Sequence, residues 1–87
     1  MKAESAVDRA YLACLDTIHG SGRTVSDSNN APNYAPRVFA KIPEANGYSK
    51  QALARAQERL FAARRIEVKY EGPPSKRRAR IYRKSVD

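Results

Sequence analysis

The sequence has few of the residues that hold small domains together by covalent or metal bonds. Its 87 residues include one cysteine, one histidine and no tryptophan. Cys14 alone cannot close an internal disulfide, and together with His19 it cannot supply the three or four protein ligands of a zinc site. We therefore expect no metal and no cofactor. Apolar packing has to stabilise a chain that buries only about 60% of its unfolded surface.

Long apolar runs are also missing. No run approaches the roughly 20 residues that cross a membrane. Residues 1–4 (MKAE) open a polar segment and not the apolar stretch of a signal peptide. The sequence therefore predicts a cytoplasmic protein with no membrane partner.

Groups suited to catalysis are equally scarce. Cys14 falls on an apolar helical stripe, where a cysteine is usually a small buried residue. His19, near the end of that helix, suits the negative end of the helix dipole. Asp8 and Asp16 lie on the same helix, whose other face must be buried, and none of these groups has a visible orienting partner. We expect that the chain is not an enzyme.

Acidic residues are too few in the second half of the chain to balance its basic residues. Residues 1–48 carry five cations and five anions, whereas residues 49–87 carry twelve cations and four anions, a difference equal to the whole net charge of +8. This asymmetry indicates a polyanionic partner. Nucleic acid fits better than a membrane surface, because the basic segment has no long apolar face.

Apolar periodicity predicts two helices in the first half of the chain. Apolar residues from Val7 to Ile18 recur at steps of three and four, which indicates a helix at about 5–18. A second helix is expected at about 35–42, because Pro36 fits its first turn and Pro43 ends it. The residues between them, 20–33, form a polar loop in which 23–25 could add a very short edge strand.

The second half predicts a third helix and a hairpin. Ser49 is a suitable N-cap for a helix at about 49–64. The apolar face of this helix holds Leu53, Ala56, Leu60 and Phe61. The opposite, polar face holds Gln51, Arg55, Glu58, Arg59 and Ala62. Gln57 lies near their boundary, where we expect its amide to be hydrogen-bonded. Alternation at 66–70 and a return strand at 80–82 predict a hairpin at about 66–83.

The predicted order of helix, helix, helix and hairpin is an α+β arrangement. The second helix, a turn and the third helix form a helix-turn-helix, and the hairpin forms a wing. The sequence therefore predicts a single winged helix-turn-helix domain over residues 1–87. In such a domain the third helix and the wing are the parts that meet nucleic acid.

Six stretches of the chain carry a likeness to a known family. They are 11–16 (YLACLD), 22–26 (GRTVS), 34–40 (YAPRVFA), 49–53 (SKQAL), 59–66 (RLFAARRI) and 72–78 (GPPSKRR). With them the chain resembles the small winged-helix domains at the C-terminal end of RepA-type phage and plasmid replication ATPases, and the free-standing relatives of those domains. The resemblance covers nearly the whole chain. It implies a DNA-binding appendage or a stand-alone DNA-binding protein in replication or transcription regulation.

The chain departs from the larger relatives in one respect. It contains no G-x-x-x-x-G-K-[ST] phosphate-binding loop. The ATPase activity of those relatives is therefore not implied for this chain.

The strongest functional signal is a cluster of cations in the predicted wing. Its members are Lys76, Arg77, Arg78 and Arg80, which follow two prolines at 73–74. Charged residues at a hairpin tip can simply keep a β edge from pairing with another chain, but one or two cations are enough for that. Four cations within five residues favour contact with phosphates or with a minor groove.

The polar face of the third helix gives a second set of candidates for nucleic-acid binding. These are Lys50, Gln51, Arg55 and Arg59. In a major groove, arginine can bridge the acceptors of guanine and glutamine can pair with adenine. An ordinary exposed helix would look similar, and phosphate contact is as consistent with the sequence as base contact. Glu58 would repel phosphates and is expected to mark the edge of the contact surface.

The tyrosines at 34, 48, 70 and 82 could in principle stack on unpaired bases. A stacking platform needs several aromatic rings on one exposed sheet face, and only two of these tyrosines lie in predicted strands. Packing roles are therefore favoured. Binding of single strands or of RNA is less well supported than binding of a duplex.

Two main functions follow from these signals. The first is binding of double-stranded DNA, with the third helix in the major groove and the wing on the adjacent backbone. The alternative is a protein–protein interaction module, whose basic face docks an acidic protein or a replication ATPase. Salt dependence separates them, because a complex dominated by phosphate contacts loses affinity steeply as salt rises.

Overall fold

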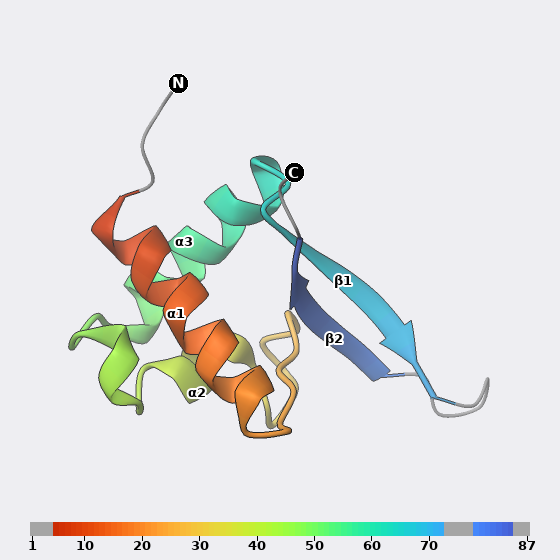
Figure 1. Ribbon diagram of the computed structural model, residues 1–87. Coiled ribbons are helices and arrows are strands. Elements are labelled where there is room, and N and C mark those ends of the chain that lie inside the picture. The colour runs from red at the N-terminus through yellow and green to blue at the C-terminus, as the bar shows by residue number, and fades with distance from the viewer. Residues whose placement is uncertain (1–4, 73–77, 85–87) are drawn as a thin grey trace.

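Three α-helices precede a two-stranded antiparallel hairpin in the computed structural model, which describes residues 5–72 and 78–84 (Figure 1). The elements in chain order are α1 (Ala6–Gly20), α2 (Ala35–Phe39), the 3-10 helix η1 (Pro43–Ala45), α3 (Lys50–Ala62), β1 (Ile66–Glu71) and β2 (Arg78–Arg83). The architecture is α+β, as the sequence predicts.

Serine side chains begin the two long helices. The Ser49 hydroxyl accepts a hydrogen bond from the Ala52 amide at 3.1 Å, and the Ser5 hydroxyl accepts one from the Asp8 amide at 3.2 Å. Each serine satisfies an amide that the first helical turn leaves without an intrahelical partner. The prediction of Ser49 as an N-cap is confirmed.

Both long helices end in the same backbone motif, with different residues at its key position. After α1, Gly22 adopts a left-handed φ of 81°, and its amide donates to the His19 carbonyl at 3.0 Å. After α3, Arg64 takes this place with a φ of 59°, and its amide donates to the Phe61 carbonyl at 3.0 Å. Glycine is the usual residue in this conformation. The α3 helix therefore ends at Ala62, two residues before the predicted end.

The predicted second helix is wrong in its last three residues. Helix α2 ends at Phe39, and the chain then tightens, since the Ile42 amide donates to the Phe39 carbonyl at 3.0 Å. Ile42 itself is extended, with φ −111° and ψ 152°. A residue before proline is pushed away from helical angles by the proline ring, so Pro43 determines this exit and opens η1.

The core joins all three helices. Tyr11 of α1 and Phe39 of α2 are fully buried and meet edge to face, with ring centroids 4.9 Å apart and planes at 79°. The Tyr11 hydroxyl donates a hydrogen bond to Oε1 of Gln57 on α3 at 2.7 Å. Gln57 is itself buried, so the expectation of a hydrogen-bonded amide is confirmed, and this bond fixes α3 against α1.

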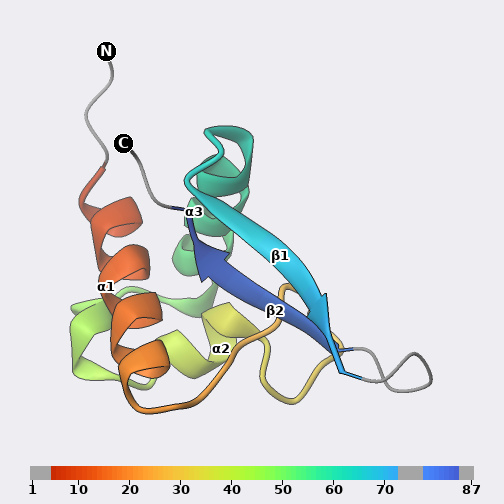
Figure 2. The same cartoon turned by 45° about the vertical axis from the view of Figure 1, so that its right-hand side comes forward.

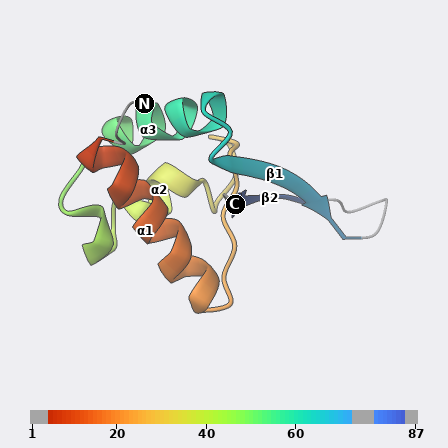
Figure 3. The same cartoon turned by 45° about the horizontal axis from the view of Figure 1, so that its top comes forward.

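One buried strand residue ties the hairpin to the helices. Ile81 of β2 lies opposite Val68 of β1 and is fully buried. Its amide faces away from β1 and donates to the Val25 carbonyl at 3.0 Å, so the loop after α1 runs beside β2 (Figure 2). The edge strand expected at 23–25 is reduced to this single hydrogen bond. Beyond it the hairpin extends away from the helices (Figure 3).

Candidate nucleic-acid interface

The outer face of α3 carries three of the predicted contact residues. Because the apolar stripe of α3 is buried, Lys50, Gln51 and Arg55 lie on its solvent side and are exposed. Gln51 and Arg55 are four residues apart and so follow one another along the helix. Within the described residues, the side chains of Lys50 and Arg55 have neither a hydrogen bond nor an ion pair, which leaves their charges available to a partner.

Arg59, the fourth candidate on α3, is held by an acidic residue. Its Nε and Nη2 atoms lie 3.0 and 2.7 Å from Oδ1 of Asp8 on α1. The Asp8 side chain is only 11% exposed, whereas that of Arg59 is 49% exposed. Arg59 therefore links α3 to α1, and a partner would have to share its charge with Asp8.

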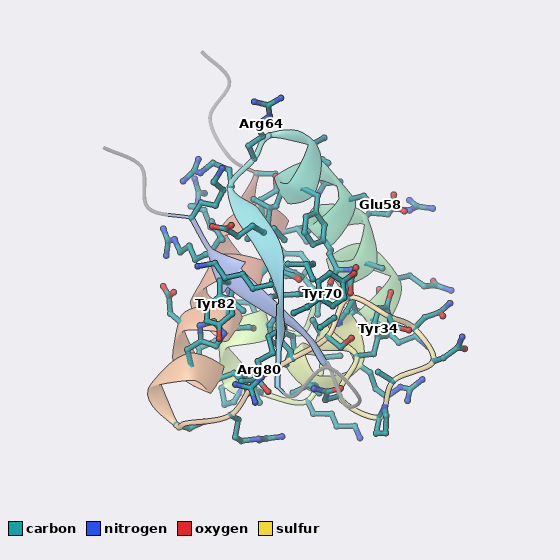
Figure 4. All side chains as sticks on the ribbon, turned by 90° about the vertical axis from the view of Figure 1, so that its right-hand side faces the viewer. Tyr34, Glu58, Arg64, Tyr70, Arg80 and Tyr82 are labelled. Carbon is teal, nitrogen blue, oxygen red and sulfur yellow. The ribbon has the colours of Figure 1, made fainter. Side chains whose placement is uncertain are left out.

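Glu58 lies on the exposed side of α3. In Figure 4 it points outward from the helix, on the side away from the hairpin. Its negative charge thus lies between the Gln51 and Arg55 surface and the last turn of α3, and its place at the edge of a contact surface stays a prediction.

The pairing register of the hairpin divides its side chains between two faces. Tyr70 lies opposite Ala79 on the face that also holds the buried Ile81, whereas Lys69 lies opposite Arg80 on the other face. Lys69 places its ammonium 5.3 Å from the ring centroid of Tyr82, within the range of a cation–π contact.

The predicted wing cations are described only in part. Lys76 and Arg77 lie outside the described residues. Arg78 is the first residue of β2, opposite Glu71. Arg80 is half-buried, is not free of partners, and lines a hollow between β2 and the loop after α1. The structure thus places the two strands of the hairpin, and the contact role of the predicted wing cations stays a prediction.

Two contacts hold β2 against α1. Nη1 of Arg83 lies 2.6 Å from Oδ2 of Asp16, with both side chains about half exposed. The Tyr82 ring is tilted against His19, with centroids 5.2 Å apart. His19 therefore meets an aromatic ring in addition to its place near the end of α1, and the hairpin is fixed at its base.

The packing role expected for Tyr70 is wrong. It is 68% exposed and is the one large apolar residue left in solvent among the residues that the structure describes. Its cross-strand neighbour is Ala79, which is too small to cover the ring. Figure 4 shows Tyr70 on the side of the hairpin that faces α3 and Tyr34. The alternation of Ile66, Val68 and Tyr70 predicts that Tyr70 lies on the same face of the hairpin as the buried residues. It does not indicate where along the strand the core ends.

The buried thiol offers no reactive group. Cys14 is fully buried, and burial, with a smaller effect of the Glu44 charge, raises the pKa of its thiol to about 11. The thiolate is the nucleophilic form. Within the described residues there is no cluster of three metal-ligating side chains. No helix in the described part of the chain is both long and apolar enough to cross a membrane.

Comparisons of the chain with protein-family models, with curated proteins and with solved structures give no match. The resemblance to replication-protein domains stays a prediction. A functional proposal has to rest on the residues of this chain and on their arrangement.

Proposed function

We propose that this chain is a winged helix-turn-helix protein that binds double-stranded DNA. In this proposal α3 enters the major groove and the hairpin lies against the adjacent backbone. One observation carries it: the exposed face of α3 with Lys50, Gln51 and Arg55 stands beside a hairpin that projects from the helices. Both belong to the part of the chain that holds the whole net charge of +8.

The dimensions of α3 support insertion into the groove. An α-helix with its side chains is about 10–12 Å wide, and the major groove of B-DNA is about 12 Å wide. Lys50 and Gln51 lie in the first turn of α3, which has no acidic residue, and Arg55 follows one turn later. A helix that enters by its N-terminal half would bring Gln51 and Arg55 to neighbouring base pairs.

The hairpin supplies the second contact. It is a pair of six-residue strands whose base is fixed by Ile81 and by the Arg83–Asp16 ion pair. A strand pair held in this way can carry a basic turn to the phosphates that flank the major groove. The cations at 76–78 make that turn suited to backbone contact.

The sequence resemblance to replication-protein domains supports a setting for this activity. We therefore propose replication or transcription regulation of a phage or plasmid as the setting. Recruitment of a replication ATPase is compatible with DNA binding, because the face of α1 that points to solvent takes no part in the proposed contact.

A set of three anisotropy titrations tests the proposal. Labelled random duplex, the matching single strand and a small acidic protein are each titrated at low and moderate salt. We expect micromolar or tighter binding of the duplex at low salt. If roughly six phosphates are contacted, the slope of log K against log salt is about −5. Duplex affinity that does not change with salt, or preferential binding of the acidic protein, would overturn the proposal.

A further inference from the structure

A basic hollow lies in the half of the chain that carries no net charge. We call this hollow the α2 groove, and its volume is about 260 Å³. It is lined by Arg23, Pro32, Arg37, Val38, Lys41 and Ile42. Three of these residues are cations from the loop after α1 and from the α2 region, and none is acidic. Positive charge from two separate segments therefore converges on one concave surface.

The cations of the α2 groove are available to a ligand. Arg23 and Lys41 are exposed, and their side chains have no hydrogen bond or ion pair within the described part of the chain. Arg37 uses one guanidinium nitrogen for a long, exposed hydrogen bond of 3.4 Å to the Asn29 carbonyl. Its other donors stay open, since a guanidinium has five N–H groups.

The floor of the groove is held by the core. Val38 and Ile42 are half-buried and pack against the buried apolar cluster. The segment from α2 to Ile42 is therefore fixed, and the amides of residues 38 and 40–42 donate backbone hydrogen bonds. A site on a fixed backbone loses less entropy when a ligand binds.

Ion pairs elsewhere in the molecule explain why the acidic residues of the first half do not offset the charge of these cations. The first half of the chain has as many acids as bases. Asp8 and Asp16, however, pair with Arg59 and Arg83 of the second half. Because two acids are used in this way, a segment with zero net charge still exposes a positive groove.

The α2 groove adjoins a second hollow beside the hairpin. This larger space, about 550 Å³, is lined by Thr24, Ser26, Ala31, Pro32, Asn33, Ala79 and Arg80. Pro32 lines both hollows. The loop between α1 and α2 supplies most of the residues that line the larger hollow. In Figures 1 and 2 this loop passes beside β2 and continues to α2. The two hollows therefore meet at Pro32, with Arg80 of the hairpin lining one and Lys41 after α2 lining the other.

We propose that the α2 groove is a phosphate-binding site, and that it takes a backbone phosphate of the same DNA that α3 and the hairpin contact. This second part rests on the proposed function. The chemistry is that of a phosphate dianion or diester held by two arginines and a lysine, with bidentate donors from the guanidinium groups. A free phosphate would use the same donors, so the test has to separate the two sources.

A double variant and a charge-matched control test the site. The double variant is Arg23→Gln with Lys41→Gln, and the control is Arg64→Gln with Lys84→Gln, after α3 and after β2. Both lower the net charge by two. We expect the double variant to weaken duplex binding by roughly tenfold at low salt and to reduce the salt slope by about 0.9. The control should change affinity by no more than about twofold, and melting temperatures should stay equal.

Amide chemical shifts identify the source of the phosphate. Inorganic phosphate and the duplex are titrated separately into the wild-type chain, and the amides of residues 23 and 37–42 are followed. Shifts with the duplex alone identify a backbone contact, and shifts with both identify a site that also accepts free phosphate. Shifts with inorganic phosphate alone would leave a phosphate site but overturn the DNA contact. Shifts with neither would overturn the site.

Failure of the α2 groove proposal and failure of the proposed function give different results. If wild-type duplex binding depends on salt but the double variant behaves like the control, the groove proposal fails and the DNA-binding proposal stands. If duplex DNA does not bind at all, the DNA-binding proposal fails, and the phosphate titration still decides whether the groove holds an anion.

Discussion

The two halves of the chain differ in charge, and the difference is greater in sequence than in space. Residues 49–87 hold all of the net positive charge, and residues 1–48 hold none. In the structure, Arg59 and Arg83 of the basic half are paired with acids of α1. Arg23 and Lys41 of the neutral half have no such partners within the described residues. Pairing, and not the charge of a segment, decides which cations can meet a partner.

The halves also differ in what they do for stability. The first half supplies Tyr11, Phe39 and the two acids that hold α3 and β2. The second half presents Lys50, Arg55 and Tyr70 to solvent. We therefore expect substitutions in the second half to separate into those that change DNA binding and those that change folding.

The largest effect is expected from the wing. Arg77→Glu with Arg78→Glu should weaken binding to all duplexes about equally, by roughly a hundredfold at low salt. The reason is that a hairpin tip meets phosphate and sugar more than base edges. Titrations against several unrelated duplexes measure this effect. The melting temperature should hardly move, because exposed charges contribute within about 0.5 kcal/mol to stability. Unchanged binding would move the contact surface away from the wing.

A smaller effect, on specificity, is expected from α3. Gln51→Ala with Arg55→Ala should reduce sequence preference more than overall affinity, because a bidentate base contact contributes about 1–3 kcal/mol of discrimination. The measurement compares the best site selected from a random library with a scrambled duplex. Equal loss on both would mean that α3 only contacts backbone, and that sequence is read by the wing or through DNA shape.

A neutral contact is expected from Tyr70. Tyr70→Ala should weaken duplex binding by roughly fivefold, about 1 kcal/mol, through loss of ring packing against the sugar–phosphate backbone. Because the side chain is uncharged, the salt slope should stay as it is in the wild type. Tyr70→Phe keeps the ring and serves as the control. A changed slope, or equal binding by all three proteins, would contradict a contact through the ring.

The smallest effect is expected from Arg59, which forms an ion pair with Asp8. The comparison is with Arg55, whose side chain has no ion pair among the described residues. Arg59→Gln should lower the free energy of unfolding by about 1 kcal/mol, since it leaves the largely buried Asp8 without its partner and the pair is partly exposed to solvent. Arg55→Gln, one turn earlier on the same helix, should leave stability within about 0.5 kcal/mol and reduce DNA affinity more. Urea denaturation and duplex titration of both variants check this. The opposite ranking would show that Arg59 is the contact residue.

Local signals in the sequence were sufficient for much of the fold. The serine before α3 predicts its N-cap, the period of apolar residues predicts the buried face of α3, and the position of Gln57 at its edge predicts a hydrogen-bonded amide. Each of these depends on residues a few positions apart. The end of α3 was missed because Arg64, and not glycine, takes the left-handed conformation.

The parts that could not be predicted depend on contacts between distant residues. Asp8 and Arg59 are 51 residues apart, and nothing local to either indicates their pairing. The exposure of Tyr70 depends on how far the hairpin extends beyond the core. The α2 groove forms only because the loop after α1 lies against the α2 region. The zero net charge of residues 1–48 gives no indication of a basic surface there. The exposure of Lys50, Gln51 and Arg55 was predictable because the period of the apolar residues determines which face of α3 is buried.

Mapping the amides that respond to duplex DNA tests the central claim most directly. A titration of random duplex into labelled protein should shift the amides of residues 50–58 and of 67–72 and 78–83 most strongly, with further shifts at 23–41 around the α2 groove. The solvent face of α1 should change little. The largest shifts on α1, with α3 and the hairpin unaffected, would contradict the proposal that the helix and hairpin of the basic half form the contact surface.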